Sequence, residues 1–228
     1  MTNGGEPESA GYADDDVPVQ VIRETLLSRS PAASSRAVAA AGVAVLLLVS
    51  GVYWTDAAGL AEALPASREA VLQRGEYWRL LTSLGAHADA RHLLANSALF
   101  GVLAYLLHGY FGSAVFPGLA TALGVLTTAL TVSGYPAQVR LVGASGMVYA
   151  MAAFWLTLYM LVERRLRPGR RLLRATGFGL IVLFPTAFEP QVSYRAHAIG
   201  FALGATAGAA FFAQRRSALR AAERVAWE

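Results

Sequence analysis

The sequence predicts an all-α membrane protein built as a bundle of six transmembrane helices, on the grounds of its composition and the spacing of its charges. Of the 228 residues, 55% are hydrophobic and only 15% are charged, whereas a soluble globular domain carries about 25% charged residues. The charges are also separated by uncharged stretches long enough to cross a bilayer, which takes about 20 residues. Disordered, fibrous and coiled-coil classes are therefore excluded.

The segment 1–36 is expected to be a disordered, cytoplasmic polar tail. It is rich in Ser, Gly, Pro and acidic residues and contains the run Asp14-Asp15-Asp16, a composition that buries too little apolar surface to fold. The six-helix core is expected over 37–214. Its first apolar stretch, 37–54, has 18 residues without a charge. Because this stretch begins too far along the chain for a secretory signal peptide, a retained spanning helix is predicted.

The longest uncharged stretch predicts two helices. Between Arg91 and Arg140 lie 48 uncharged residues, more than twice the roughly 20 that one crossing requires. The chain must turn back once, and the turn is marked by three residues that interrupt helices, Gly109, Gly112 and Pro117. Helices are therefore predicted over 92–108 and 113–132.

Three more helices complete the six, over 141–162, 175–188 and 196–214. The uncharged part of the fifth has only 14 residues. It is about 21 Å long at 1.5 Å per residue, against a hydrocarbon core of about 30 Å. This helix crosses only if the preceding Leu172 and Leu173 are included and Arg174 snorkels to the headgroups.

Arginine placement predicts that both termini lie in the cytoplasm. All 19 basic residues are arginine, and 13 of them fall in the segment 1–36, between the fourth and fifth helices, or in 215–228, against 6 on the other side. Positive charge accumulates on the cytoplasmic side of multi-pass proteins. The distribution explains the pI near 9.7 without a nucleic-acid partner. It predicts a multi-pass protein of the cell membrane whose last segment, 215–228, is a basic cytoplasmic tail.

Several function classes lack the residues they need. Cysteine is absent, which excludes disulfides, thiol nucleophiles and cysteine-ligated metals. Every Asp and Glu lies outside the apolar cores, so a proton relay or an aspartyl intramembrane protease has no carboxylates. The His-Glu-x-x-His motif of zinc proteases is also missing. A transporter needs a polar path and usually shows an internal repeat, and neither is visible.

Three of the predicted helices begin on the outer side with polar residues. His92 opens the second helix, Ser145 the fourth and His197 the sixth. Asn96 lies four residues after His92 and Tyr149 four residues after Ser145, so each pair shares one helical face. Because all three helices enter the membrane at the same face, these side chains are expected to meet there.

A glycine stripe accompanies His197. Gly200, Gly204 and Gly208 follow it at +3, +7 and +11 and therefore lie on its face of the helix. Small residues at every fourth position let helix backbones approach closely. If the neighbour is the helix of Ser145, the stripe brings the imidazole within hydrogen-bonding reach of the serine and supplies a general base.

Ser145 lies in Gly143-Ala144-Ser145-Gly146, in the first turn of its helix. The first N–H groups of a helix have no internal partner and carry positive partial charge. These donors, with His92 and Asn96, are suited to stabilise an oxyanion. Because no acid is present to orient the histidine, the pattern predicts a Ser-His dyad. Each motif alone also fits a structural role, since small residues, buried histidines and amides commonly hold helices together.

Four motifs in this order resemble the rhomboid family of intramembrane serine proteases over about residues 75–208. They are Trp78-Arg79, His92 to Asn96, Gly143 to Gly146 with Tyr149, and Ala196-His197-x-x-Gly200-x-x-x-Gly204. The resemblance implies that Ser145 is the nucleophile and His197 the base. It further implies that His92 and Asn96 supply oxyanion donors and that His197 packs on Tyr149. Trp78-Arg79 would belong to a long, partly embedded loop that braces the fold.

The resemblance also implies a function. Members of the family cleave single-pass membrane proteins within or beside their transmembrane helix, next to small side chains, without a cofactor or metal. Substrate is expected to arrive laterally from the bilayer beside the short helix 175–188, with Pro185 in the gate. One departure is His108, four positions before Gly112, where members often carry an acid. The alternative is a non-catalytic rhomboid-like protein that binds or escorts membrane clients, which would be free to lose the serine or the histidine.

Overall fold

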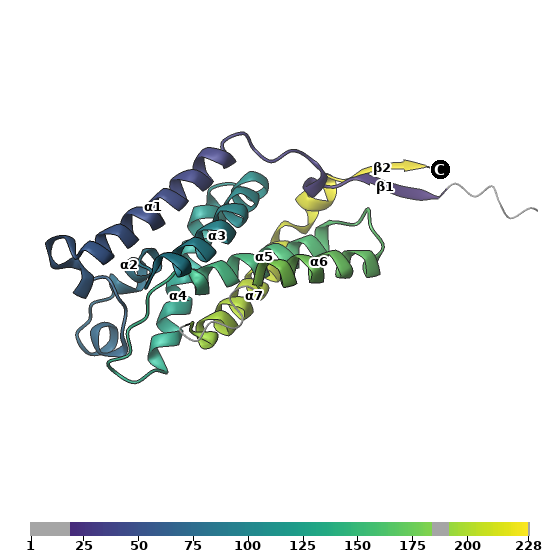
Figure 1. The fold of residues 1–228 in the computed structure, drawn as a ribbon. Coiled ribbons are helices and arrows are strands. Elements are labelled where there is room, and N and C mark those ends of the chain that lie inside the picture. Colours follow the sequence, from purple (N-terminus) through teal and green to yellow (C-terminus); the bar gives the residue numbers. More distant parts are fainter. Residues whose placement is uncertain (1–18, 184–191, 228) are drawn as a thin grey trace, which may run out of the picture.

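The structure, a computed structural model, describes residues 19–183 and 192–227 and is built mostly of helices (Figure 1). Within these residues, five helical segments are long and apolar enough to cross a membrane, by length and composition. They are α1 (Ser35–Thr55), α3 (Ala90–Phe111), η4 (Ala114–Leu119) with α4 (Ala120–Ser133), α5 (Ser145–Val162) and α7 (Tyr194–Ala221). A shorter helix, α6 (Pro168–Leu183), packs against α5. The predicted all-α membrane bundle is confirmed.

The turn between α3 and α4 lies where glycine and proline predict it. α3 ends at Gly112, whose φ of +76° is a left-handed conformation that favours glycine. The Phe116–Pro117 peptide bond that follows is cis. Gly109 does not break the helix and remains inside α3.

His108 lies near the C-terminal end of α3, where the resemblance predicts an acid, and still makes hydrogen bonds. Its Nδ1 donates to the Phe116 carbonyl at 3.0 Å, and its Nε2 lies 3.2 Å from the hydroxyl of Ser34. The ring is buried. His108 therefore ties α3 to the turn before α4 and to the residue that precedes α1.

α5 is the central helix and begins later than predicted. Two thirds of the residues in its 18-residue apolar stretch are buried, compared with 17% in the corresponding stretch of α1. It starts at Ser145 instead of 141 because Leu141 forms an isolated antiparallel bridge with Ala66, with N···O distances of 2.7 and 3.0 Å. Gly143 then turns the chain with a φ of +117°. The nucleophile expected from the sequence is thus the first residue of the helix.

The long loop between α1 and α3 contains η2 (Ala57–Glu62), η3 (Glu69–Gln73) and α2 (Arg79–Gly85). Arg79 is buried and holds this loop together, because it forms an ion pair with Glu76 and donates to the carbonyls of Glu62 and Pro65. The neighbouring Trp78 is 56% exposed.

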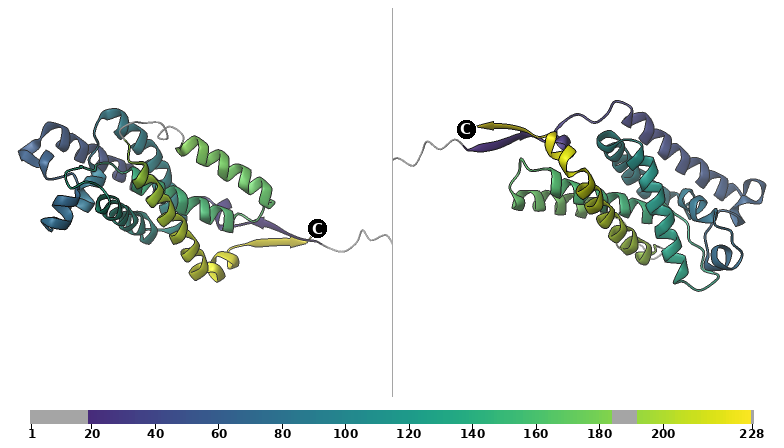
Figure 2. Two further views of the ribbon diagram at one scale, coloured as in Figure 1. Left: turned by 90° about the horizontal axis from the view of Figure 1, so that it is seen from below. Right: turned by 180° about the vertical axis from the view of Figure 1, so that it is seen from behind.

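The segments on either side of the bundle contain two short strands and the end of α7. Strand β1 (Gln20–Glu24) pairs antiparallel with β2 (Arg224–Trp227), and α7 continues past 214 to Ala221. Secondary structure thus lies within the described parts of both segments that the sequence predicts to be tails, 1–36 and 215–228. Ordering comes from distant partners, such as the hydrogen bonds from Tyr110 to the carbonyls of Leu27 and Arg29. These strands lie at the end of the bundle opposite to α2 (Figure 2).

α6 begins at Pro168, earlier than the predicted 175, and includes the two leucines and the arginine of the sequence prediction. Arg171, in its first turn, donates to the carbonyl of Met160 at 2.6 Å and so fixes the start of α6 against the end of α5. The predicted gate with Pro185, and the end of the predicted helix up to 188, lie outside the described residues.

Candidate active site

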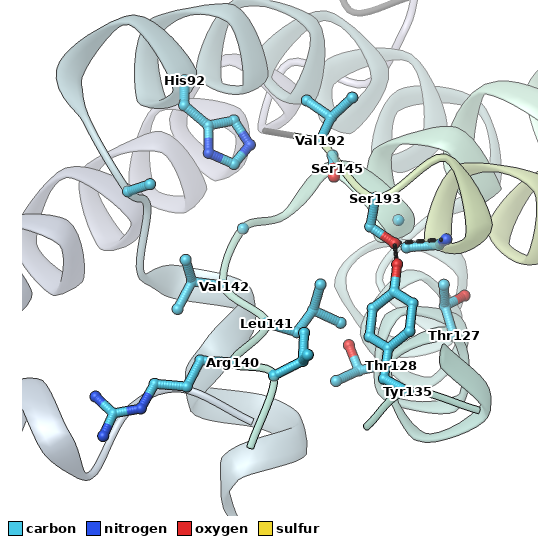
Figure 3. A pocket seen from close by; sticks show the side chains of 15 residues that line it. His92, Thr127, Thr128, Tyr135, Arg140, Leu141, Val142, Ser145, Val192 and Ser193 are labelled. Carbon is cyan, nitrogen blue, oxygen red and sulfur yellow. Dashed lines mark hydrogen bonds between the residues drawn. The ribbon is translucent and has the colours of Figure 1, made fainter. Parts of the chain in front are cut away.

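A cavity of about 270 Å³ lies where α3, α5 and α7 begin (Figure 3). Its walls come from the starts of these helices, from α4 and from the extended segment that leads into α5. They include His92, Thr127, Tyr135, Val142, Ser145 and Ser193. The three helix starts that the sequence predicts on one face therefore do converge.

Ser145 is presented to this cavity by a turn that requires glycine. It is 8% exposed and follows the N-cap residue Ala144. Gly143 has a φ of +117°, and a Cβ there would lie 2.8 Å from Cε1 of His92. Both the backbone conformation and the approach of the imidazole thus exclude a side chain at this position.

His197 lies in the first turn of α7 and is 5% exposed. Its ring stacks on that of Tyr149, with centroids 3.9 Å apart and an angle of 11° between the planes. Tyr149 follows Ser145 by one helical turn, so the imidazole lies at the level of the first turns of α5. Among residues 19–183 and 192–227, Nε2 of His197 has no hydrogen-bonding partner.

The glycine stripe of α7 packs directly on α5. A Cβ on Gly200 would overlap the carbonyl oxygen of Gly146, and one on Gly204 would overlap that of Ala150. The predicted close contact between these two helices is confirmed. It places the backbone one turn after His197 against the residue next to Ser145.

His92 and Asn96 occupy different places relative to the cavity. His92 lines it beside Gly143, and its backbone N–H is fixed by the carboxylate of Asp89, the N-cap of α3, at 2.8 Å. Asn96 is 2% exposed, is not among the residues that line the cavity, and donates one amide hydrogen to the carbonyl of His92 at 3.0 Å. An amide nitrogen carries two hydrogens, so it can donate to a second acceptor as well.

Two residues at the cavity rim are absent from the sequence prediction. The Tyr135 hydroxyl lies 2.6 Å from Oγ of Ser193, and Ser193 in turn caps α7 by accepting from the N–H of Ala196 at 3.0 Å (Figure 3). A serine just before an apolar helix is a recognisable N-cap. The tyrosine comes from the end of α4, and no local pattern indicates its partner.

His87 is the other residue that the sequence gives no reason to select. It lies in the linker between α2 and α3 and is fully buried. Its ring contacts that of His92 edge-on, with centroids 5.1 Å apart, and its Nε2 lies 3.3 Å from the N–H of Ala144. Burial, followed by the proximity of His92, lowers the pKa of His87 to about 4, so the ring is neutral at pH 7.

Comparison with known proteins agrees with this geometry. A family model described as "Rhomboid domain" matches residues 74–214, which include all residues that line the cavity. Rhomboid-related protein 3 of Homo sapiens is 32% identical over 151 residues, or 59% of this chain and 36% of the human protein. The chain thus spans about a third of that relative's length. A Bacillus subtilis (strain 168) protein named "Putative rhomboid protease YdcA" is 26% identical over 172 residues, or 71% of this chain and 84% of that protein. With its helical bundle and the family model matched over most of its length, the chain belongs to the rhomboid family.

Proposed function

We propose that this protein is an intramembrane serine endopeptidase that cleaves the transmembrane segments of single-pass membrane proteins with a Ser145-His197 dyad. The observation that carries the proposal is the arrangement at the start of α5 and α7. Ser145 lines the cavity, His197 stacks on Tyr149 one turn away, and glycine contacts hold the two helices together.

In the proposed reaction, Nε2 of His197 takes the proton of the Ser145 hydroxyl, and Oγ attacks the scissile carbonyl. The amine leaves with a proton returned by His197, and water then hydrolyses the acyl-enzyme. The two side chains make no hydrogen bond in the structure, and Nε2 of His197 has no hydrogen-bonding partner among the described residues. Catalytic hydrogen bonds often tighten only when substrate is bound.

The oxyanion of the tetrahedral intermediate is assigned to the same end of α5. The N–H groups of its first turn carry positive partial charge, and the imidazole of His92 lies against Gly143 just before them. Asn96, one turn further along α3, would add its second amide hydrogen once the side chain turns toward the cavity. Several fixed donors around a developing charge are the usual source of such stabilisation.

The extended segment before α5 is suited to hold an unwound substrate. The N–H and C=O of Leu141 are taken up by Ala66. Along an extended strand, the N–H and C=O groups of successive residues point alternately to its two edges. Those of Arg140 and Val142 therefore point away from Ala66. A substrate segment can add to such an edge as a strand. Helices with Gly, Pro or other weak helix formers near the outer face should therefore be cleaved best, because they unwind most readily.

The proposed orientation places both ends of the described chain in the cytoplasm. The pairing of β1 with β2 puts residues 20–24 and 224–227 on the same side of the bundle. Thirteen of the 19 arginines fall on that side, as the positive-inside rule requires. The cavity at the opposite end then opens toward the exterior of the cell membrane.

A serine-directed phosphonate probe and a reporter transmembrane substrate test the proposal in purified protein. The wild-type chain should be labelled, Ser145→Ala should not be, and cleavage should disappear in Ser145→Ala and His197→Ala. A wild-type chain that is folded yet neither labelled nor active would refute the peptidase assignment. Labelling without cleavage of any reporter would favour the client-binding alternative.

A further inference from the structure

The turn that presents Ser145 is held from behind by a histidine outside the proposed dyad. The backbone N–H of Ala144, the residue before Ser145, points at Nε2 of His87 at 3.3 Å. Nδ1 of the same ring lies 3.0 Å from Oγ of Ser50 and 3.2 Å from the carbonyl of Gly85. The ring thus connects α1, the linker after α2 and the start of α5.

These partners fix the tautomer of His87. A backbone N–H can only donate and a carbonyl can only accept, so Nε2 must be bare and Nδ1 must carry the proton. Ser50 is consistent with this assignment, because its hydroxyl donates to the carbonyl of Gly85 at 3.0 Å and keeps a lone pair for Nδ1–H. The carbonyl of His87 also accepts from Trp54 Nε1 at 2.7 Å, which fixes the backbone.

We propose that His87 is a positioning residue that accepts the Ala144 N–H through Nε2 and so sets the place of Ser145 in the cavity. The proposal rests on the proposed function, since it concerns the geometry of that nucleophile. His87 does not line the cavity and touches no reacting atom. Its effect is transmitted through the backbone of Gly143 and Ala144.

The buried surroundings of the His87 imidazole restrict where the turn before Ser145 can lie. His87 is fully buried, so water does not replace its acceptor. The titratable groups that influence it are His92, edge-on to the ring, and Asp89 at the start of α3. Loss of the Nε2 acceptor leaves a buried N–H without a partner, and the turn must then move to find one.

The test compares a rescue pair with a matched control. His87→Leu removes the acceptor, whereas Gln can place its Oε1 where Nε2 lies. The expected result is a loss of about 10- to 100-fold in kcat for His87→Leu, with KM nearly unchanged, and recovery in His87→Gln. His108→Leu removes another buried, hydrogen-bonded histidine at the far end of α3 and should lower the melting temperature without changing kcat of the folded protein.

Two kinetic outcomes overturn the proposal: a His87→Leu variant with kcat equal to that of His108→Leu, or a His87→Gln variant no better than His87→Leu. Nitrogen NMR gives a readout that does not need activity, because the chain has only 4 histidines and His87→Gln assigns one of them. His87 should show a bare Nε2 and a protonated Nδ1 at pH 7. The opposite tautomer would refute the hydrogen bond, whether or not the wild-type chain is active. An inactive wild-type chain with the expected tautomer would count against the proposed function alone.

Discussion

Alanine at position 204 tests whether close packing of α7 on α5 is needed for activity. A Cβ on Gly204 would overlap the carbonyl oxygen of Ala150 and lie 2.7 Å from its Cα. Carbon atoms normally approach to about 3.5–4.0 Å, so the two backbones must separate by about 1 Å. Overpacking of this kind costs about 1–3 kcal/mol. A displacement of about 1 Å between catalytic groups lowers rates by about 100-fold.

The assay is kcat/KM on a reporter transmembrane substrate, with the melting temperature measured in the same detergent. Gly204→Ala should lose about 100-fold in kcat/KM. Gly208→Ala should lose far less, because its nearest neighbour, Cβ of Thr157, is 3.0 Å away and has to yield by only a few tenths of an ångström. Gly51→Ala, with nothing within 4 Å, is the neutral control. A Gly204→Ala enzyme with wild-type activity would refute the reasoning.

Three further predictions concern the supports of the site. Arg79→Ala should lower the free energy of unfolding by about 1–3 kcal/mol, because the carbonyls of Glu62 and Pro65 lose their donor, whereas Arg74→Ala, at a side chain that is 46% exposed, should shift the melting temperature far less; equal thermal shifts would contradict this. Tyr149→Phe should keep the ring stack and most of kcat, while Tyr149→Ala should lose about 3- to 10-fold, and equal rates for the two variants would show that the stack is not needed. Because the pKa of folded His87 is about 4 and that of an unfolded histidine is about 6.5, the unfolded state binds more protons between these values, so stability should fall as pH drops from about 6.5 to 4, by up to about 3 kcal/mol. The melting temperature of His87→Gln should depend less on pH over this range, and an unchanged slope would show that His87 is not the group responsible.

The parts of the protein that the sequence predicts are those that depend on local spacing. That His92, Ser145 and His197 lie near the starts of three helices that cross the membrane in the same direction follows from uncharged stretches and helical periodicity. So does the glycine stripe, since residues three and four apart share a face whatever lies elsewhere in the chain. The Gly112 turn belongs to the same class, because its left-handed φ is a property of one residue.

The parts that could not be predicted depend on partners far away in the chain. α5 begins late because Leu141 pairs with Ala66, and β1 forms only because β2 lies beside it. His87 gives no signal in a linker of small residues. Its role becomes visible only when Ser50 and Ala144, from two other helices, are brought to its two ring nitrogens.

The contacts between α5 and α7 also divide the motion of α7 into discrete steps. Gly200 faces the carbonyl of Gly146, and Gly204 faces that of Ala150. The two helices therefore fit together only in registers that differ by whole steps of four residues. Sliding α7 by one such step of four residues carries the imidazole of His197 about 6 Å along the axis, away from its stack on Tyr149. Axial sliding of α7 would therefore disrupt the proposed site in whole steps and could not tune the proposed activity gradually.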